Sequence, residues 1–208
     1  MRVALVDAGG ANIGSVQYAL QRLGVEALLT GDAEVIRSAD RVILPGVSTA
    51  GVVMGRLREL DLVETLRTLQ APLLGVCVGM QLLYERSEEG DVECLGLLPG
   101  TVRKLSASTG IRVPHMGWNK LHSLRPSSLT DGIAAEAYAY FVHSYAAPVT
   151  GDCLASSEHG SAFAAIAQRG HVAGAQFHPE RSAAVGARLL QSSGQFSLLP
   201  VRRLDLYL

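Results

Sequence analysis

The chain has 208 residues, a formal net charge of −1 and 48% hydrophobic residues, which fits one globular domain with a sizeable core. Its charge balance lacks the clustered basic excess that nucleic acid or an anionic membrane surface requires, so we expect neither partner. The N-terminal run reaches Asp7 too soon for a signal peptide, and no apolar run is long enough to span a membrane.

The three cysteines, at positions 77, 94 and 153, fit neither a disulfide framework nor a paired metal motif. This usage indicates a reducing, cytoplasmic environment, with Cys94 and Cys153 as inert packing residues. We expect no bound metal and no cofactor.

Short apolar runs alternate with helical patterns in the first half of the chain. We expect strands at 2–7, 25–30, 41–45 and 72–76, and helices at 12–23, 49–69 and 78–86. This alternation is typical of an α/β fold with a mostly parallel central sheet flanked by helices, whose ligands bind beyond the carboxyl ends of the strands.

From about residue 98 the pattern changes to consecutive short strands, at 138–145, 152–157, 163–168 and 171–177, before a closing helix at 182–191. We therefore expect a smaller, strand-rich second half. The prediction is a single domain over 1–195, followed by a tail at 196–208 of unknown role.

The segment Leu73–Leu83 places a cysteine between a predicted strand and a predicted helix. With Gly75 and Gly79 on either side, Cys77 matches the G-x-S-x-G elbow that exposes a nucleophile, with sulfur in place of oxygen. A helix N-terminus at this point favours the thiolate over the thiol. A buried core cysteine is the alternative, and the elbow alone does not separate the two.

A second segment, Gly174–Ser182, supplies a base and a group to orient it. Residues two apart point to the same side of an extended chain, so Glu180 can hold one nitrogen of His178 while the other faces Cys77. A base held in this way activates a weak nucleophile. A core histidine and a solvated glutamate are the alternative, which the pairing with an elbow cysteine disfavours.

These segments resemble the class I (triad-type) glutamine amidotransferases, through the elbow and Phe177-His178-Pro179-Glu180. More narrowly, the chain is similar to the glutaminase subunits of imidazole glycerol phosphate synthase, an enzyme of histidine biosynthesis, from Val3 to about Leu190. The resemblance implies a flavodoxin-like fold of the class I amidotransferase type. It also implies that L-glutamine is hydrolysed and that its ammonia passes to a (β/α)8-barrel cyclase partner, which converts PRFAR to imidazole glycerol phosphate and AICAR.

Two backbone donors are expected to hold the oxyanion of the reaction. The N–H of Val78, directly after the nucleophile, is one. The resemblance implies that the loop 44–49 supplies the other, through Gly46 and Val47. Ser48 stands where the family usually has glycine, and a positive φ at this position would strain serine by about 1 kcal/mol or more.

The resemblance also assigns the glutamine pocket. The backbone of His143, Ser144 and Tyr145 is expected to line it, although the alternating pattern there also suits a plain strand. Gln81, one helical turn after the cysteine, and Glu89 complete the recognition of the substrate's head group. Glu89 is assigned to the ammonium of glutamine, with a simple surface charge as the alternative.

Three residues are assigned to the partner interface by the same resemblance. Asn12 lies in the glycine-rich segment Asp7–Ser15, which on physical grounds could equally cradle an anion or cap a helix. Trp118, the only tryptophan, is expected to anchor the partner rather than pack in the core. Arg181 follows the predicted triad.

Two other functions remain open from the sequence. One is the glutaminase of pyridoxal phosphate synthase, which also couples a cysteine elbow to a barrel partner. The other is a subunit that docks the barrel but hydrolyses glutamine poorly, as Ser48 would suggest if it disturbs the oxyanion loop.

Overall fold

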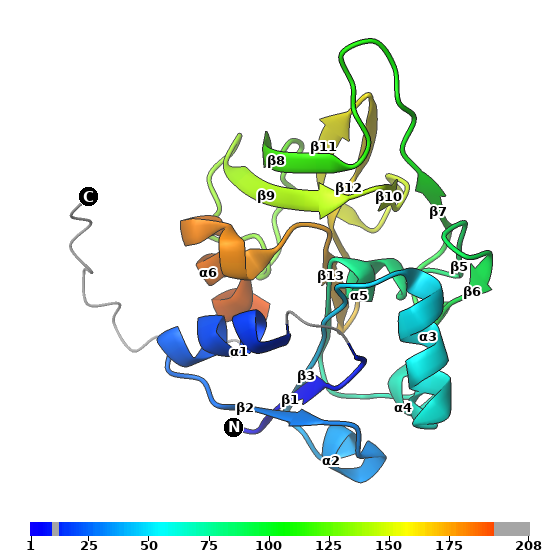
Figure 1. Ribbon diagram of the computed structural model, residues 1–208. Coiled ribbons are helices and arrows are strands. Elements are labelled where there is room, and N and C mark those ends of the chain that lie inside the picture. Colours follow the sequence, from blue (N-terminus) through cyan, green and yellow to red (C-terminus); the bar gives the residue numbers. More distant parts are fainter. Residues whose placement is uncertain (10–12, 194–208) are drawn as a thin grey trace.

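The computed structural model describes residues 1–9 and 13–193 (Figure 1). The predictions for Asn12 and for the tail at 196–208 lie outside the described residues. The helices are α1 (Ile13–Arg22), α2 (Ala33–Arg37), α3 (Ala50–Glu59), α4 (Leu62–Arg67), α5 (Val78–Gln81) and α6 (Ala183–Ser193), with a short 3-10 helix η1 (Pro179–Arg181). The strands are β1 (Val3–Val6), β2 (Ala27–Thr30), β3 (Arg41–Leu44), β4 (Leu73–Val76), β5 (Arg86–Ser87), β6 (Val92–Glu93), β7 (Thr101–Lys104), β8 (His115–Lys120), β9 (Tyr138–His143), β10 (Tyr145–Ala146), β11 (Cys153–His159), β12 (Ser161–Arg169) and β13 (Val172–Ala175).

A seven-stranded sheet in the order β11-β12-β13-β4-β3-β1-β2 forms the centre of the molecule. Strands β2, β1, β3, β4 and β13 are parallel neighbours, which is the flavodoxin-like order, and β12 and β11 extend the sheet antiparallel. Helices α1 and α6 lie on one side of this sheet and α3 and α4 on the other (Figure 1). The predicted α/β class is confirmed.

The strand-rich second half adds two small sheets above the carboxyl ends of the parallel strands (Figure 1). One has the order β10-β7-β5-β6 and the other pairs β8 with β9. The core between the layers is mainly aliphatic, and the inner parallel strands β1 and β4 are buried on both faces. Its fully buried aromatic side chains are Tyr84, Phe141, Phe163 and Phe177.

The register of two neighbouring strands sets the position of the site. Gly174 on β13 lies opposite Gly75 on β4, and the two strands run parallel. Cys77 follows β4 and His178 follows β13, so both residues emerge at the same edge of the sheet. Parallel pairing therefore unites two segments about one hundred residues apart.

The structure differs from the predicted helices in three places. The helix expected over 49–69 is divided into α3 and α4, because Asp61 takes a left-handed conformation (φ 54°) that ends the first helix. The helix expected over 78–86 ends at Gln81, after which Glu85 donates its N–H to Gly100 and the chain enters β5.

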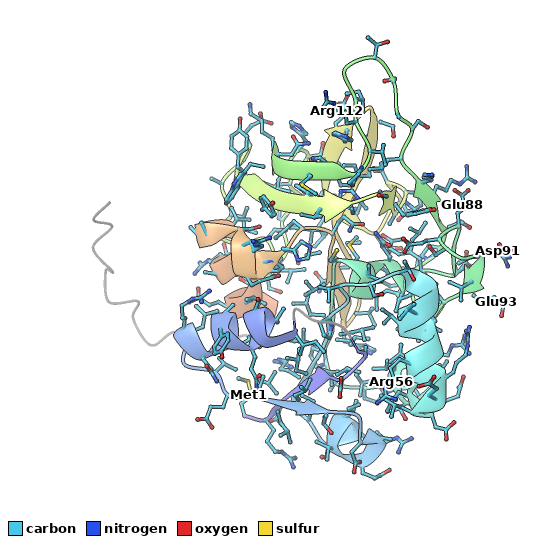
Figure 2. The ribbon with its side chains drawn as sticks, viewed as in Figure 1. Met1, Arg56, Glu88, Asp91, Glu93 and Arg112 are labelled. Atoms are coloured by element: carbon cyan, nitrogen blue, oxygen red, sulfur yellow. The ribbon has the colours of Figure 1, made fainter. Side chains whose placement is uncertain are left out.

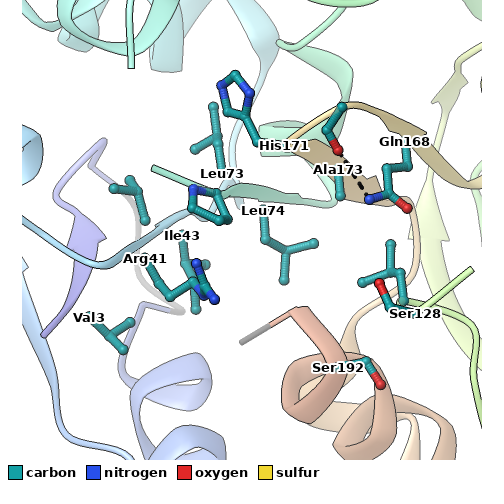
Figure 3. A pocket seen from close by; sticks show the side chains of 14 residues that line it. Val3, Arg41, Ile43, Leu73, Leu74, Ser128, Gln168, His171, Ala173 and Ser192 are labelled. Atoms are coloured by element: carbon teal, nitrogen blue, oxygen red, sulfur yellow. Dashed lines mark hydrogen bonds between the residues drawn. The ribbon is translucent and has the colours of Figure 1, made fainter. Parts of the chain in front are cut away.

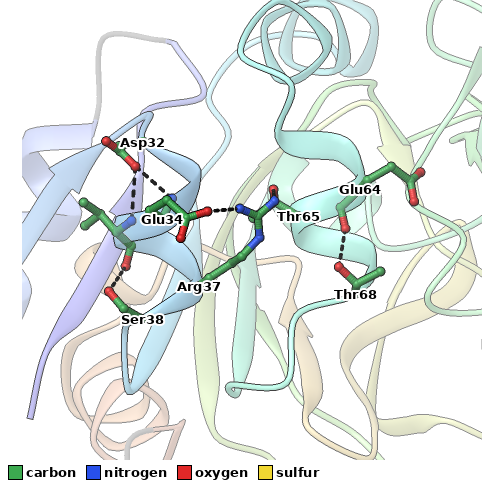
Figure 4. Close-up of polar contacts among 8 residues, drawn as sticks. Asp32, Glu34, Arg37, Ser38, Glu64, Thr65 and Thr68 are labelled. Carbon is green, nitrogen blue, oxygen red and sulfur yellow. Dashed lines mark hydrogen bonds and ion pairs between the residues drawn. The ribbon is translucent and has the colours of Figure 1, made fainter.

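Helix α2 is the third difference, since it was not predicted. It has five residues, too few for a clear periodic pattern. Asp32 caps it by accepting hydrogen bonds from the N–H groups of Glu34 and Val35 (Figure 4). Arg37 then contacts Glu34 and donates to Thr65 on α4 over 2.8 Å, so contacts between helices fix α2 in place.

Charged side chains project outward from the fold (Figure 2). Glu88, Asp91 and Glu93 do so on the small sheet, and Arg56 and Arg112 do so elsewhere. Among the described residues, no helix has the length and apolar character needed to cross a membrane.

Candidate active site

Cys77 occupies a strained turn between β4 and α5. Its φ of 54° and ψ of −113° are unusual for a residue with a side chain. The turn is possible only because glycines flank it: a Cβ on Gly79 would lie 1.9 Å from the carbonyl oxygen of Leu44, and one on Gly75 would lie 2.5 Å from that of Gly79. These contacts give the predicted elbow a physical basis and place Cys77 at the N-terminus of α5.

His178 and Glu180 form the second half of the site. The imidazole Nδ1 lies 2.9 Å from the Glu180 carboxylate, whose side chain is only 2% exposed. Cys77 also acts on this imidazole, since its sulfur raises the imidazole pKa. The sequence predicted the bond between His178 and Glu180, but not the backbone conformation that allows it. Glu180 lies in η1 rather than in an extended segment.

The charge of His178 is controlled by these two partners. Burial by itself lowers the pKa of the imidazole, but its interactions with Cys77 and Glu180 outweigh burial and raise this pKa above its ordinary value. The site therefore favours an imidazolium next to the cysteine sulfur, the arrangement that stabilises a thiolate.

The loop after β3 packs directly against the elbow. A Cβ on Gly46 would lie 2.6 Å from the backbone nitrogen of Gly79 and 2.8 Å from the Val78 side chain. Gly46 and Val78, two of the predicted oxyanion residues, thus lie together beside the elbow, and the role of Val47 stays a prediction. The φ of Ser48 is not positive, so the backbone strain considered for this serine does not occur in this conformation.

Gln81 is held on the first turn of α5 by two acceptors. Its Nε2 donates to the carbonyl oxygen of Tyr145 over 2.7 Å and to Oε1 of Gln176 over 3.0 Å. Its own Oε1 is buried and has no hydrogen-bond partner among the described residues. A buried acceptor without a partner is costly, so this oxygen is available to a donor group, and its role in binding glutamine stays a prediction.

The remaining predicted pocket residues have structural partners. Glu89 accepts a hydrogen bond of 2.8 Å from the N–H of Ala50, which caps α3 directly after the oxyanion loop. His143 is buried, and its Nδ1 bonds to the carbonyl oxygen of Tyr145 over 2.9 Å. The carbonyl of Ser144 accepts from Leu105. A role for Glu89 in binding ammonium stays a prediction.

Trp118 and Arg181, which the sequence assigned to one interface, share a surface. The exposed Trp118 ring packs edge-on against Tyr140 at 5.8 Å between centroids, and the Arg181 guanidinium lies over the same tyrosine at 5.3 Å. Tyr140 also accepts the backbone N–H of His178. This surface therefore adjoins the site.

Sequence reasoning missed Gln176. Its side chain is fully buried, accepts from Gln81 and directs Nε2 toward the Cys77 sulfur at 3.9 Å. The available signal was its alternation with Gly174 and His178, which places an amide on the same side as the histidine directly after an apolar strand.

One cavity beside the central strands lies away from the cysteine. A cavity of about 270 Å³ opens at the amino ends of β1, β3 and β4, with Val3, Arg41, Leu73 and His171 on its wall (Figure 3). Cys77 follows the carboxyl end of β4. Within residues 1–9 and 13–193, no cluster of three or more acidic, histidine or cysteine residues could hold a metal ion.

An elbow cysteine, a histidine held by a glutamate and a facing backbone loop define an amide-cleaving enzyme of the Cys-His-Glu type. The family model of class I glutamine amidotransferases matches residues 4–193. The chain is 62% identical, over 91% of its length and 95% of the relative's, to "Imidazole glycerol phosphate synthase subunit HisH" of Xanthomonas axonopodis pv. citri. It is 60% identical, with the same coverage, to the HisH subunit of Xylella fastidiosa.

Solved structures agree at the level of the fold. A glutamine amidotransferase is similar with a TM-score of 0.71 at 20% identity, covering 92% of this chain and 98% of that one. PurLQS of Thermotoga maritima gives 0.70 at 19% identity, covering 95% and 99%. The chain belongs to the class I glutamine amidotransferases and, within them, to the HisH family. These relatives favour this family over the glutaminases of pyridoxal phosphate synthase.

Proposed function

We propose that this protein is the glutaminase subunit of an imidazole glycerol phosphate synthase. The observation that carries the proposal is the Cys77–His178–Glu180 arrangement, with its 2.9 Å bond between imidazole and carboxylate beside an elbow cysteine. The high identity to HisH subunits supports the choice of this enzyme among amidotransferases.

In the first half-reaction, the thiolate of Cys77 attacks the side-chain amide carbon of glutamine. The N–H groups of Val78 and Val47 hold the oxyanion, each such donor contributing about 10²–10³ in rate. His178 gives its proton to the leaving nitrogen, and ammonia departs. A γ-glutamyl thioester on Cys77 remains.

In the second half-reaction, His178 removes a proton from water, which attacks the thioester and releases glutamate. Gln81 is proposed to hold the head group of the substrate through its buried Oε1, which has no other partner among the described residues. The thiolate of Cys77 is regenerated and the cycle closes.

The ammonia needs a protected route, because in bulk water it becomes ammonium, which is no nucleophile. We propose that a (β/α)8-barrel cyclase docks on the surface of Trp118, Tyr140 and Arg181, receives this ammonia and acts on PRFAR. Asn12, which lies outside the described residues, is also proposed to contact the partner. We further propose that the protein acts in the cytoplasm.

The test is to compare two nitrogen sources in the assembled complex. Cys77→Ala is expected to abolish glutamine-dependent synthesis of imidazole glycerol phosphate, while synthesis from ammonium salts continues at the wild-type rate. Loss of both activities in an intact complex would contradict the division of labour between the two chains.

A further inference from the structure

Two buried histidines face each other behind the glutamine pocket. His115 on β8 and His143 on β9 are a directly opposed pair in the β8–β9 register. The His115 Nδ1 lies 3.0 Å from the His143 Nε2, and the two residues are only 4% and 6% exposed. Neither side chain has a part in the mechanism described above.

The backbone fixes the direction of every hydrogen bond in this pair. The Tyr145 carbonyl can only accept, so the His143 Nδ1 carries a hydrogen and donates to it over 2.9 Å. Neutral His143 then offers Nε2 as an acceptor, and His115 must donate to it from Nδ1. The His115 Nε2 in turn accepts from Asn119, whose Nδ2 also donates to the Glu158 carbonyl over 2.7 Å.

The same carbonyl joins this pair to the active site. Tyr145 O accepts from His143 and also from Gln81, whose amide nitrogen continues to Gln176. The Gln176 Nε2 then points at the Cys77 sulfur, 3.9 Å away. A continuous chain of hydrogen bonds therefore runs from β8 to the nucleophile. On both sides of the Tyr145 carbonyl, the donors point toward this oxygen.

This chain of contacts sets the orientation of one amide. Because Tyr145 O and the Gln176 Oε1 both accept, the Gln81 side chain must present its NH₂ to them. The Gln81 Oε1 is then the atom left for a ligand. A flipped amide would place oxygen against two acceptors, which is unfavourable in a buried site.

We propose that His115, His143 and Gln176 form a positioning relay for the glutaminase reaction, in which the neutral histidine pair holds Gln81 and Gln176 in the orientation that serves substrate and thiolate. His115 acts only through its neighbours and is a positioning residue. The inference rests on the proposed glutaminase function. Burial lowers the pKa of His115 to about 4 and that of His143 to about 3, which keeps both rings neutral near pH 7.

Two substitutions of His115 separate a hydrogen-bonding role from a packing role. His115→Phe keeps a ring to stack on Phe141 and His159 but removes the donor to His143. His115→Asn removes the ring but keeps an amide nitrogen near the position of Nδ1. The relay predicts about a tenfold fall in kcat/KM for Phe, mostly in KM for glutamine, and a smaller fall for Asn. The reverse order would overturn the proposal.

A double substitution tests whether the relay acts as a unit. Gln176→Met removes both of its hydrogen bonds at similar volume, and Gln176→Met combined with His115→Phe should lose little more activity than the worse single variant. If the two positions acted independently, the fold-losses in kcat/KM of the single variants would multiply in the double variant. That result would also overturn the proposal. His159→Phe is the matched control, because this ring stacks on His115 at 4.2 Å outside the relay. It should retain wild-type kinetics.

A second readout does not depend on the partner or on glutamine. Alkylation of Cys77 by iodoacetamide in the full-length chain, measured against pH, should slow at neutral pH for Gln176→Met and His115→Phe but not for His159→Phe. Unchanged alkylation in the first two would contradict the link to Cys77. If the wild-type complex shows no glutaminase activity, the proposed function fails while this ranking still tests the relay. Should His115→Phe not fold, Gln176→Met compared with His159→Phe still tests the link to Cys77.

Discussion

Gly79 has no room for a side chain, because a Cβ at this position would lie 1.9 Å from the carbonyl oxygen of Leu44. Leu44 ends β3 and precedes the oxyanion loop, while Gly79 lies on the first turn of α5, directly behind the nucleophile. One close backbone contact therefore sets the distance between the elbow and the loop that faces it. We expect the proposed oxyanion hole to depend on that distance.

Gly79→Ala is expected to cost both stability and activity. The methyl group would meet backbone rather than a flexible side chain, so β3 and α5 must separate, at about 3 kcal/mol of unfolding free energy or more. We expect the midpoint of urea unfolding to fall. The glutaminase rate should decrease at least about 10²-fold, which is the loss in rate expected when one oxyanion donor is removed. A variant with wild-type turnover would show that the loop spacing is unimportant.

The matched control is Gly55→Ala on α3. A Cβ there meets nothing within 4 Å, and the residue is helical. Alanine should stabilise the helix by about 0.4–1 kcal/mol and leave the glutaminase rate unchanged. The same urea titration therefore distinguishes a steric effect at Gly79 from a general effect of replacing glycine.

The members of the triad should differ in their contributions. His178→Asn removes the base, and with it proton transfer worth about 10²–10⁴-fold, whereas Glu180→Gln keeps a base that is less well oriented. Steady-state glutamate release by the complex should fall further for His178→Asn than for Glu180→Gln. Equal losses, or an active His178→Asn, would contradict the assignment.

Much of the site could be predicted because its signals are local. The Cys77 elbow and the segment with His178 and Glu180 each fall within a few residues, and the structure brings them together through parallel strands. The relay has no such signal. His115 and His143 lie on β8 and β9 and Gln176 directly follows β13, so only the β8–β9 register and the path of the chain after β13 make them neighbours in space.

The elements show the same division between local and tertiary causes. Long periodic segments such as α1 follow from the apolar pattern, with buried Val16 and Leu20 one turn apart. The break at Asp61 does not, since nothing in the apolar pattern marks its left-handed conformation. Helix α2 depends on contacts of Arg37 with α4, which a single sequence does not reveal.

The protein should lose stability on mild acidification through its two buried histidines. Burial lowers the pKa of His115 to about 4 and that of His143 to about 3, below the unfolded value of 6.5. Above pH 6.5 neither state binds these protons. As pH falls from about 6.5 toward 4, these histidines become protonated in the unfolded chain but stay neutral in the folded protein, so the free energy of unfolding decreases.

His178 does not produce this acid effect. Its pKa is raised, so its contribution is fully present below pH 6.5 and is lost only as pH rises. Urea unfolding at several pH values should show a shallower acid slope for His115→Phe, by up to about 1.4 kcal/mol per pH unit. Gly55→Ala, which changes stability without removing a titratable group, should keep the wild-type slope. A wild-type slope in His115→Phe would contradict the lowered pKa.

The oxyanion loop offers a test of basal activity at Ser48. The serine has an ordinary φ in this structure, and we propose that the partner and its substrate induce a rotated peptide that points a loop N–H at the oxyanion. The N–H of Val47 belongs to the peptide between Gly46 and Val47, and rotating this peptide requires the backbone at Ser48 to adjust as well. Glycine at position 48 reaches positive-φ conformations that cost other residues about 1 kcal/mol. Ser48→Gly should therefore raise the basal glutaminase rate of the isolated chain about fivefold. Ser48→Ala, which loses the hydroxyl but keeps the Cβ, should match the wild type, and equal rates for the two variants would exclude a backbone effect at this position.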